Sequence, residues 1–405
     1  MTNQPPSGQP QAGAGSPGEV FVAFLKLGLT SFGGPIAHLG YFRDELVIRR
    51  KWLSDSAYAD LVALCQFLPG PASSQVGFAL GMMRAGWAGA LAAFLAFTLP
   101  SALLLLGFAL TAANLQGPAA SGALNGLKIV AVAIIAHALW GMARSLCPDR
   151  LRASIAAGAV VVLAILPGAS GMIFAILLGA LSGLALLRGT GPSTGGAVVM
   201  PVTRGMASAA LIAFFGLLAL LPLLAGQSPV LALIDSFYRA GALVFGGGHV
   251  VLPLLQAEFV ATGQVTADDF LAGYGAAQAV PGPLFTFAAY LGAVMGSAPT
   301  GITGAGLALM AIFLPGFLLL AGVLPFWDQF RSMARAQTLM QGANAAVVGI
   351  LGAALYSPVF TSAIGDLREF ALALTCFILL LLWKTPPWIV VILAALGGTG
   401  LALAA

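Results

Sequence analysis

The sequence predicts an all-α protein with many membrane-spanning helices. Of its 405 residues, 60% are hydrophobic and only 7% are charged, and the mean hydropathy is +0.99. Soluble domains carry about 25% charged residues, so most of this chain must lie in lipid. Continuous apolar runs such as residues 90–110 are long enough to cross a bilayer as helices, whereas β-barrel strands would be short and alternating. We therefore predict a polytopic helical membrane protein with about 10–13 spans.

Charge and cysteine usage narrow the class further. The net charge is +4 and the isoelectric point is near 9.1, but the basic residues are scattered in short connections, which indicates membrane topology and no nucleic-acid partner. The three cysteines stand singly, so we expect neither disulfides nor a metal site, and no motif indicates a cofactor. Residues 1–18 are rich in Pro, Gly, Gln and Ser, and we expect them to form a disordered tail.

The chain contains two copies of one segment. The stretch FLKLGLTSFGGP from Phe24 returns as FYRAGALVFGGG from Phe237, and QFLPGP from Gln66 returns as QAVPGP from Gln278. Further matches follow in the same order through each half, which indicates an internal duplication. We predict a first repeat at residues 19–188, a linker with an extra apolar helix at 189–230, and a second repeat at 231–405.

The distribution of basic residues predicts that the repeats lie upside down relative to each other. Arg331 and Arg335 follow the third element of the second repeat, whereas the matching connection at residues 111–121 contains no cation. Lys and Arg accumulate in cytoplasmic loops, so the basic faces of the two repeats are exchanged. The exact number of spans stays open, because the Pro-Gly-Pro segments fit either complete spans or re-entrant hairpins.

Four interruptions in the apolar segments mark the predicted site. A helix broken in lipid leaves free N–H and C=O groups, which are costly unless they are buried in protein or line a polar cavity. The N-terminal end of a half-helix attracts anions, and transporters with inverted repeats place such ends near mid-membrane. We therefore expect one central anion site built from Gly33, Gly34, Pro69, Gly70, Pro71, Gly246, Gly247, Gly248, Pro281, Gly282 and Pro283.

Polar residues beside these breaks complete the predicted site: Lys26, Gln66, Ser73, Arg239, His249 and Gln278. Two alternatives stay open, namely that the cations extend to the membrane interface and that the glutamines bond neighbouring helices. Taken together, the set is rich in donors and cations and poor in carboxylates. That chemistry predicts an oxyanion ligand.

The acidic residues are not part of the predicted anion site, and we expect them to have other roles. Asp55 and Asp268 stand at predicted helix starts, where we expect them to cap the helices. Asp60 and Glu258 are candidate proton carriers, and we expect neither to have a counterpart in the other half. Asn125 is expected to form hydrogen bonds between helices.

The motifs FGGP, FLPGP, FGGGHVVLP and QAVPGP, in two tandem copies, resemble the chromate ion transporter family in its long-chain, two-domain form. The resemblance covers nearly all of the chain from Glu19 to Leu403. It implies efflux of chromate, with sulfate as the look-alike anion, across a bacterial inner membrane, and hence chromate resistance. Within this chain Pro35 matches Gly248 and Ile36 matches His249, so the two half-sites are not equivalent.

These observations favour a secondary transporter that works by alternating access. No nucleotide-binding GxxxxGK[ST] motif occurs in the chain, so energy would come from the membrane potential or a proton gradient. An oxyanion channel and a sulfate carrier are the alternatives. A membrane enzyme would need clustered nucleophiles, bases or metal ligands, so we expect no enzymatic activity. The sequence leaves open the selectivity between chromate and sulfate, the coupling, and the oligomeric state, a homodimer included.

Overall fold

The computed structural model describes residues 15–112, 117–188, 201–245, 248–297, 299–327 and 333–404. Within these ranges every regular element is helical, and six helices are long and apolar enough to cross a membrane. The predicted all-α membrane fold is therefore confirmed. Most of the predicted tail, Gly246, Gly247 and Arg331 lie outside the described residues, and Pro17 and Gly18 already belong to the first helix.

The first half of the chain contains seven helices in the described ranges: α1 (Pro17–Thr30), α2 (Gly34–Phe42), α3 (Asp55–Phe67), α4 (Ala72–Ala112), α5 (Pro118–Leu146), α6 (Arg150–Ile165) and α7 (Ala169–Leu186). A π-helical segment, Arg43–Arg49, continues α2. The element α4 is two helices joined at a kink, because Ala85 and Gly86 have non-helical backbone angles. A helix therefore begins after Pro69-Gly70-Pro71, as predicted, and ends one residue before the kink.

The second half repeats this order after α8 (Arg204–Leu224). Its helices are α9 (Pro229–Ala242), α10 (Val251–Phe259), α11 (Ala267–Ala277), α12 (Phe287–Val294), α13 (Gly301–Val323), α15 (Ala334–Ala354), α16 (Thr361–Ala363), α17 (Leu367–Leu381) and α18 (Pro387–Leu403). The helices α12 and α13 correspond to the two parts of α4. Short 3-10 turns, Gly248–Val250 and Leu284–Thr286, precede α10 and α12 at the breaks.

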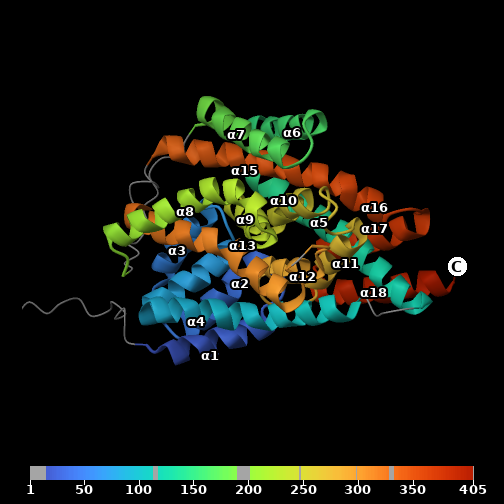
Figure 1. Cartoon of the computed structure of the whole chain (residues 1–405), viewed down its shortest axis with the longest axis horizontal. Helices are drawn as coiled ribbons and strands as arrows, with labels where there is room; N and C mark the ends of the chain where they lie inside the picture. Colours follow the sequence, from blue (N-terminus) through green and yellow to red (C-terminus); the bar gives the residue numbers. More distant parts are fainter. Residues whose placement is uncertain are drawn as a thin grey trace, which may run out of the picture.

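The two halves are inverted and exchange their last helices. In Figure 1, α15 starts at the left and ends at the right, whereas its counterpart α5 starts at the right. The helix α7 of the first half packs on α15 of the second, and α18 of the second half packs on α5 of the first. Each half is therefore completed by the final helices of the other, and the predicted inversion is confirmed.

Glycines allow these exchanged helices to approach closely. A Cβ atom on Gly126 of α5 would collide with the carbonyl oxygen of Ala394 in α18, and a Cβ atom on Gly342 of α15 would collide with that of Gly179 in α7. Gly126 and Gly342 hold matching positions in the two repeats. Small residues at helix contacts are the usual way to pack helices in lipid, where no hydrophobic effect drives them together.

Valine at Gly126 or at Gly342 is expected to destabilise the protein. The new side chain has no room between the helix backbones, and overpacking of this kind costs about 1–3 kcal/mol. Gly141→Val on α5 is the matched control, because no heavy atom lies within 4 Å of a Cβ built there. Thermal unfolding of the full chain in detergent measures the effect, and equal midpoints for the three variants would contradict it.

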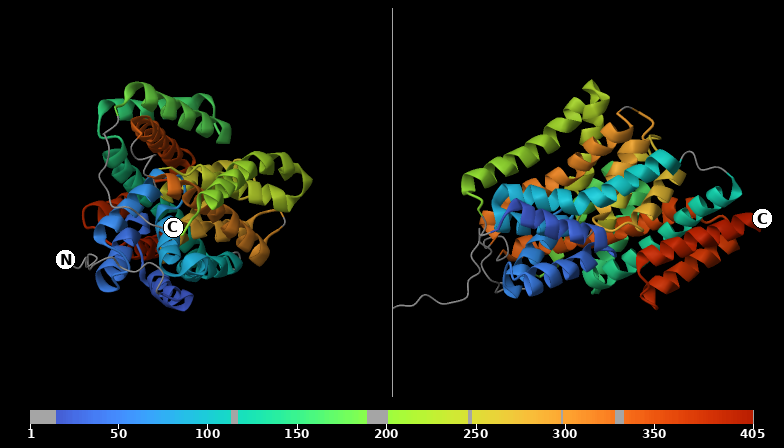
Figure 2. Two further views of the ribbon diagram at one scale, coloured as in Figure 1. Left: turned by 90° about the vertical axis from the view of Figure 1, so that its left-hand side faces the viewer. Right: turned by 90° about the horizontal axis from the view of Figure 1, so that it is seen from below.

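The helix α8 lies on the outside of the molecule and holds α9 in place (Figure 2). The hydroxyl of buried Tyr238 in α9 donates to the carbonyl oxygen of Phe214 in α8 at 3.0 Å. The neighbouring residue on α9 is Arg239, one of the predicted site cations. The contact between α8 and α9 thus fixes the helix that carries this cation.

Candidate functional site

The interrupted segments of the two repeats contact each other directly. The N–H group of Gly70 donates to the carbonyl oxygen of Val244 at 2.7 Å, and the N–H group of Gly282 donates to the carbonyl oxygen of Ser31 at 2.8 Å. Gly70 matches Gly282, and Ser31 matches Val244. Each Pro-Gly-Pro segment therefore binds the end of the first helix of the other repeat. We call this pair of backbone contacts the crossing.

The crossing requires glycine at two positions. Gly70 has φ 120° and Gly282 has φ 97°, a region that side chains disfavour. A Cβ atom on Gly70 would lie 3.1 Å from the Cα of Gly316 in α13, and one on Gly282 would lie 2.8 Å from the Oγ of Ser101 in α4. The crossing therefore also touches the long helix of the opposite repeat on each side.

One expectation about the crossing is wrong for this conformation. The amide groups at the breaks were expected to be open to an anion, but the N–H groups of Gly70 and Gly282 are bonded to carbonyl oxygens of the other repeat. Inversion explains this difference, because it brings the carbonyl end of one broken helix to the amide of the other. Of the other backbone predictions, Gly33 and Gly34 also have positive φ, at 100° and 79°.

Buried polar atoms gather near the crossing. Gln75 donates from Nε2 to the carbonyl oxygens of Pro69 and Gly316 at 3.1 and 2.9 Å, so its side chain spans both repeats there. Unpaired buried polar atoms are costly and commonly mark places where water or a ligand binds. Within the described residues, such atoms without a hydrogen-bond partner include Ser31 Oγ, His38 Nε2, Ser74 Oγ, Gln75 Oε1, Thr98 Oγ1 and Gln278 Nε2.

Two histidines flank the crossing in different surroundings. His38 is fully buried, with Nδ1 3.3 Å from Ser73 Oγ and its ring edge-on to Phe97. His249 is half-buried, with Nδ1 2.8 Å from the hydroxyl of Tyr274. A Cβ atom on Gly34 would lie 3.9 Å from His249 Nε2, so His249 of the second repeat reaches the first glycine break.

The two predicted glutamines do not share one environment. Gln278 is half-buried beside Tyr274, and its buried Nε2 has no hydrogen-bond partner among the described residues. The side chain of Gln66 is exposed at the end of α3. The structure therefore brings Gln278, Ser73 and His249 to the neighbourhood of the crossing and leaves Gln66 at the surface of the protein.

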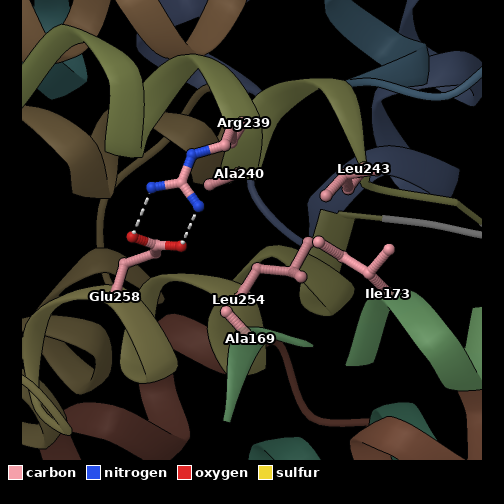
Figure 3. A pocket seen from close by; sticks show the side chains of 7 residues that line it. All are labelled: Ala169, Ile173, Arg239, Ala240, Leu243, Leu254 and Glu258. Atoms are coloured by element: carbon pink, nitrogen blue, oxygen red, sulfur yellow. Dashed lines mark hydrogen bonds and ion pairs between the residues drawn. The ribbon is translucent and has the colours of Figure 1, made fainter. Parts of the chain in front are cut away.

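Both predicted cations are paired with carboxylates. Lys26 Nζ lies 2.8 Å from Glu45 Oε2, and Arg239 forms two bonds to Glu258 at 2.9 and 3.0 Å. Figure 3 shows the second pair, in which the guanidinium faces the carboxylate. The expectation that the site is poor in carboxylates is therefore wrong. A cation in a low-dielectric interior is stabilised by a partner of opposite charge, so unpaired cations were not to be expected there.

Glu45 and Glu258 are equivalent residues of the two repeats. Each follows its cation by 19 residues. The prediction that Glu258 has no counterpart is therefore wrong. That common spacing is visible in the sequence, but neither the residues around Glu45 nor those around Glu258 form a recognisable motif.

The two equivalent ion pairs differ in their other neighbours. Arg50 and Arg49 also approach Glu45, at 3.0 and 3.5 Å, so three cations surround one carboxylate. Arg239 also binds Asp235 at 2.9 Å, so two carboxylates surround one cation. We call these groups the basic cluster (Lys26, Glu45, Arg49 and Arg50) and the acidic cluster (Asp235, Arg239 and Glu258).

The two aspartates at helix starts pair with cations and do not cap the helices. The caps are Ser54 and Thr266, whose side chains accept from backbone N–H groups. Asp55 accepts from Arg43 at 2.6 and 3.0 Å, and this hydrogen-bonded cation lowers the pKa of the Asp55 carboxyl. Asp268 lies 3.2 Å from Lys128 of α5. The caps therefore lie one residue before Asp55 and two residues before Asp268, because Ser54 and Thr266 take the capping positions.

A polar cavity of about 420 Å³ lies between α5, α17 and α18. Two cations, Lys128 and Arg368, and two carboxylates, Asp366 and Glu369, contribute to its lining. Asn125 donates to Glu369 at 2.6 Å, which is the hydrogen bond between helices expected for this asparagine. The sequence did not reveal this cavity, because its lining residues come from different repeats and are far apart in the sequence. Its balanced charges give it no preference for an anion.

Inverted repeats, interrupted helices that meet, and ion pairs at matching positions define the class of this protein, a multi-pass membrane transport protein. The chain belongs to the chromate transporter family, whose model, described as Chromate transporter, matches residues 18–184 and 231–399. The resemblance seen in the motifs is thereby confirmed, and membership supports chromate as the transported oxyanion.

Curated relatives with similar sequences carry related names. A chromate transport protein of Pseudomonas aeruginosa is 32% identical over 349 residues, which cover 83% of this chain and 79% of the relative. A chromate transport protein of Cupriavidus metallidurans is 27% identical over 390 residues, covering 94% and 92%. A protein of Synechococcus elongatus named as a probable chromate transport protein is 29% identical and covers 93% of both chains. No solved structure matches the chain.

Proposed function

We propose that the protein exports chromate from the bacterial cytoplasm across the inner membrane by alternating access and thereby confers chromate resistance. The observation that carries this proposal is the crossing, in which each broken segment of one repeat is bonded to the other repeat. Two hydrogen bonds at matching positions give two equivalent places at which the repeats can separate. Rocking of one repeat against the other would release the two contacts in turn.

The basic cluster supports an oxyanion as the substrate. Glu45 is 7% exposed and is bonded by Lys26 and Arg50, while the side chain of Lys26 is 51% exposed. Three cations around one carboxylate leave an excess of positive charge on the exposed side of the cluster. An arriving dianion would be attracted to this excess and could take Lys26 as a direct partner. The substrate then passes to the polar atoms near the crossing.

Uptake of chromate and of sulfate, measured separately in inverted membrane vesicles, tests this function. Export then appears as uptake, and accumulation against a gradient is expected for chromate, since a channel could only dissipate the gradient. Accumulation of sulfate without chromate would make the protein a sulfate carrier. Dissipation alone would make it a channel.

Lys26→Gln is expected to raise the KM for chromate severalfold, because the variant removes a cation from the basic cluster and leaves Arg49 and Arg50 to bind Glu45. Lys384→Gln is the matched control, since Lys384 is an exposed lysine between α17 and α18 and has no ion pair with Glu45. Initial uptake rates at graded chromate concentrations give the KM. An unchanged KM in Lys26→Gln would remove this lysine from the substrate path.

A further inference from the structure

The acidic cluster has two carboxylates and one guanidinium, and all three groups are largely buried. Asp235 is 3% exposed, and the side chains of Glu258 and Arg239 are 13% and 26% exposed. Arg239 is bonded to both carboxylates, at 2.9 Å to Asp235 and at 2.9 and 3.0 Å to Glu258. One guanidinium therefore serves two carboxylates, and a buried negative charge without a partner is strongly unfavourable.

One carboxylate oxygen of the cluster has no hydrogen-bond partner among the described residues. Arg239 binds Oδ2 of Asp235, while Oδ1 of Asp235 is buried and unpaired. The cavity that Arg239 and Glu258 line has a volume of about 10 Å³ (Figure 3). That volume admits about one water molecule. The cluster thus has an unsatisfied acceptor and room for water, but no room for a tetrahedral anion.

Among the residues that the structure describes, no further cation compensates the cluster from the helices packed around it. The bounds of α7 and α13 contain no charged residue, and α10 contributes only Glu258. Arg204 and Arg335, in the first turns of α8 and α15, are both exposed. Of the remaining titratable neighbours, Tyr238 is bonded to the Phe214 carbonyl and His249 to Tyr274.

The geometry points to a proton-binding site: we propose that Asp235 and Glu258 together bind one proton, which is carried by one of the two carboxyl groups at a time. The Arg239 guanidinium lies between them. The proton neutralises the second carboxylate, and water in the adjoining cavity carries it to and from the cluster. The equivalent basic cluster has the opposite excess of charge and binds no proton. The two repeats therefore have different roles: the basic cluster of the first attracts the anion, and the acidic cluster of the second binds the proton.

Infrared difference spectroscopy of the full chain in lipid vesicles tests the site without any substrate. A C=O stretching band of a protonated carboxyl is expected. Asp235→Asn and Glu258→Gln are each expected to remove one protonated carboxyl per chain, since each variant leaves one carboxylate for one guanidinium. Arg239→Gln is expected to strengthen the band, because two carboxylates then lose their cation. Glu45→Gln, at the matching position of the first repeat, is expected to leave it unchanged.

A band that persists unchanged in both Asp235→Asn and Glu258→Gln would overturn the proposal, and so would its absence from the unaltered protein. The two substitutions keep side-chain size and lie on different helices, so the test stands if one variant fails to fold. The role of the proton in transport rests on the proposed function, whereas its presence does not. Failure of chromate transport would therefore leave the infrared result intact.

Proteoliposomes test the coupling. Chromate accumulation driven by an imposed pH gradient is compared with the exchange of internal for external chromate, which needs no gradient. In Asp235→Asn the ratio of driven accumulation to exchange is expected to fall to the level seen without a gradient. An unchanged ratio would mean that the bound proton does not move with the anion.

Discussion

Gly282→Ala is expected to reduce chromate transport at least about tenfold, since 1.4 kcal/mol already alters an equilibrium tenfold. The backbone of Gly282 has φ 97°, and strain of this kind costs about 1–3 kcal/mol. The new Cβ atom would also lie 2.8 Å from Ser101 Oγ, so the segment must shift away from α4. That shift would break the hydrogen bond from Gly282 to Ser31 and with it one half of the crossing. Uptake by inverted vesicles measures the loss.

Gly86→Ala separates backbone strain from loss of the crossing. Gly86 has φ 65° at the kink of α4, and no heavy atom lies within 4 Å of a Cβ built there. This variant should therefore unfold at a lower temperature while it keeps most of its transport. Equal transport in Gly86→Ala and Gly282→Ala would show that the crossing has no special part in the transport cycle.

Arg239→Gln is expected to be the most destabilising change of a charged residue described here. It leaves the Asp235 and Glu258 carboxyl groups in the protein interior without their cation, and breaking a buried ion pair in this way costs about 3–5 kcal/mol. The double variant Arg239→Gln with Glu258→Gln should recover part of this loss, because it removes one of the two carboxyl groups that lost the cation. Thermal unfolding of the full chain in detergent is the measurement.

Lys26→Gln provides the matched comparison for Arg239→Gln. The side chain of Lys26 is half exposed, and Glu45 keeps Arg49 and Arg50 as partners after the substitution. We therefore expect a much smaller loss of stability than for Arg239→Gln. If both variants unfold at the same temperature, the difference in charge between the two clusters does not affect the stability of the fold.

The sequence predicted the duplication, the inversion and the helix breaks at Gly33-Gly34 and at the two Pro-Gly-Pro segments, because glycine and proline act locally and their pattern recurs in both halves. It could not predict the crossing. The contact from Gly70 to Val244 and that from Gly282 to Ser31 depend on how the inverted halves meet, and nothing in the local pattern specifies which backbone groups pair. The free amides expected at the breaks were a consequence of treating each half separately.

The ion pairs show a second limit of the sequence. Lys26 and Arg239 were identified from their place before the glycine breaks, whereas their partners Glu45 and Glu258 lie in stretches that share few residues. Asp235 has no counterpart at all, since Val22 occupies the matching position. The difference in charge between the clusters therefore emerged only when side chains distant in the sequence were brought together.

The exchange of terminal helices sets an order for biogenesis. The groove of α5 around Gly126 is filled by α18, which is synthesised after the other helices of both repeats, so the first repeat cannot reach its final packing while the ribosome is still translating the second. Contacts between such distant segments form late and slowly. Until α18 has been made, lipid or a membrane chaperone must occupy that groove. The repeats are thus separable as sequences but interdependent in assembly, much like the two subunits of a domain-swapped dimer joined by a tether.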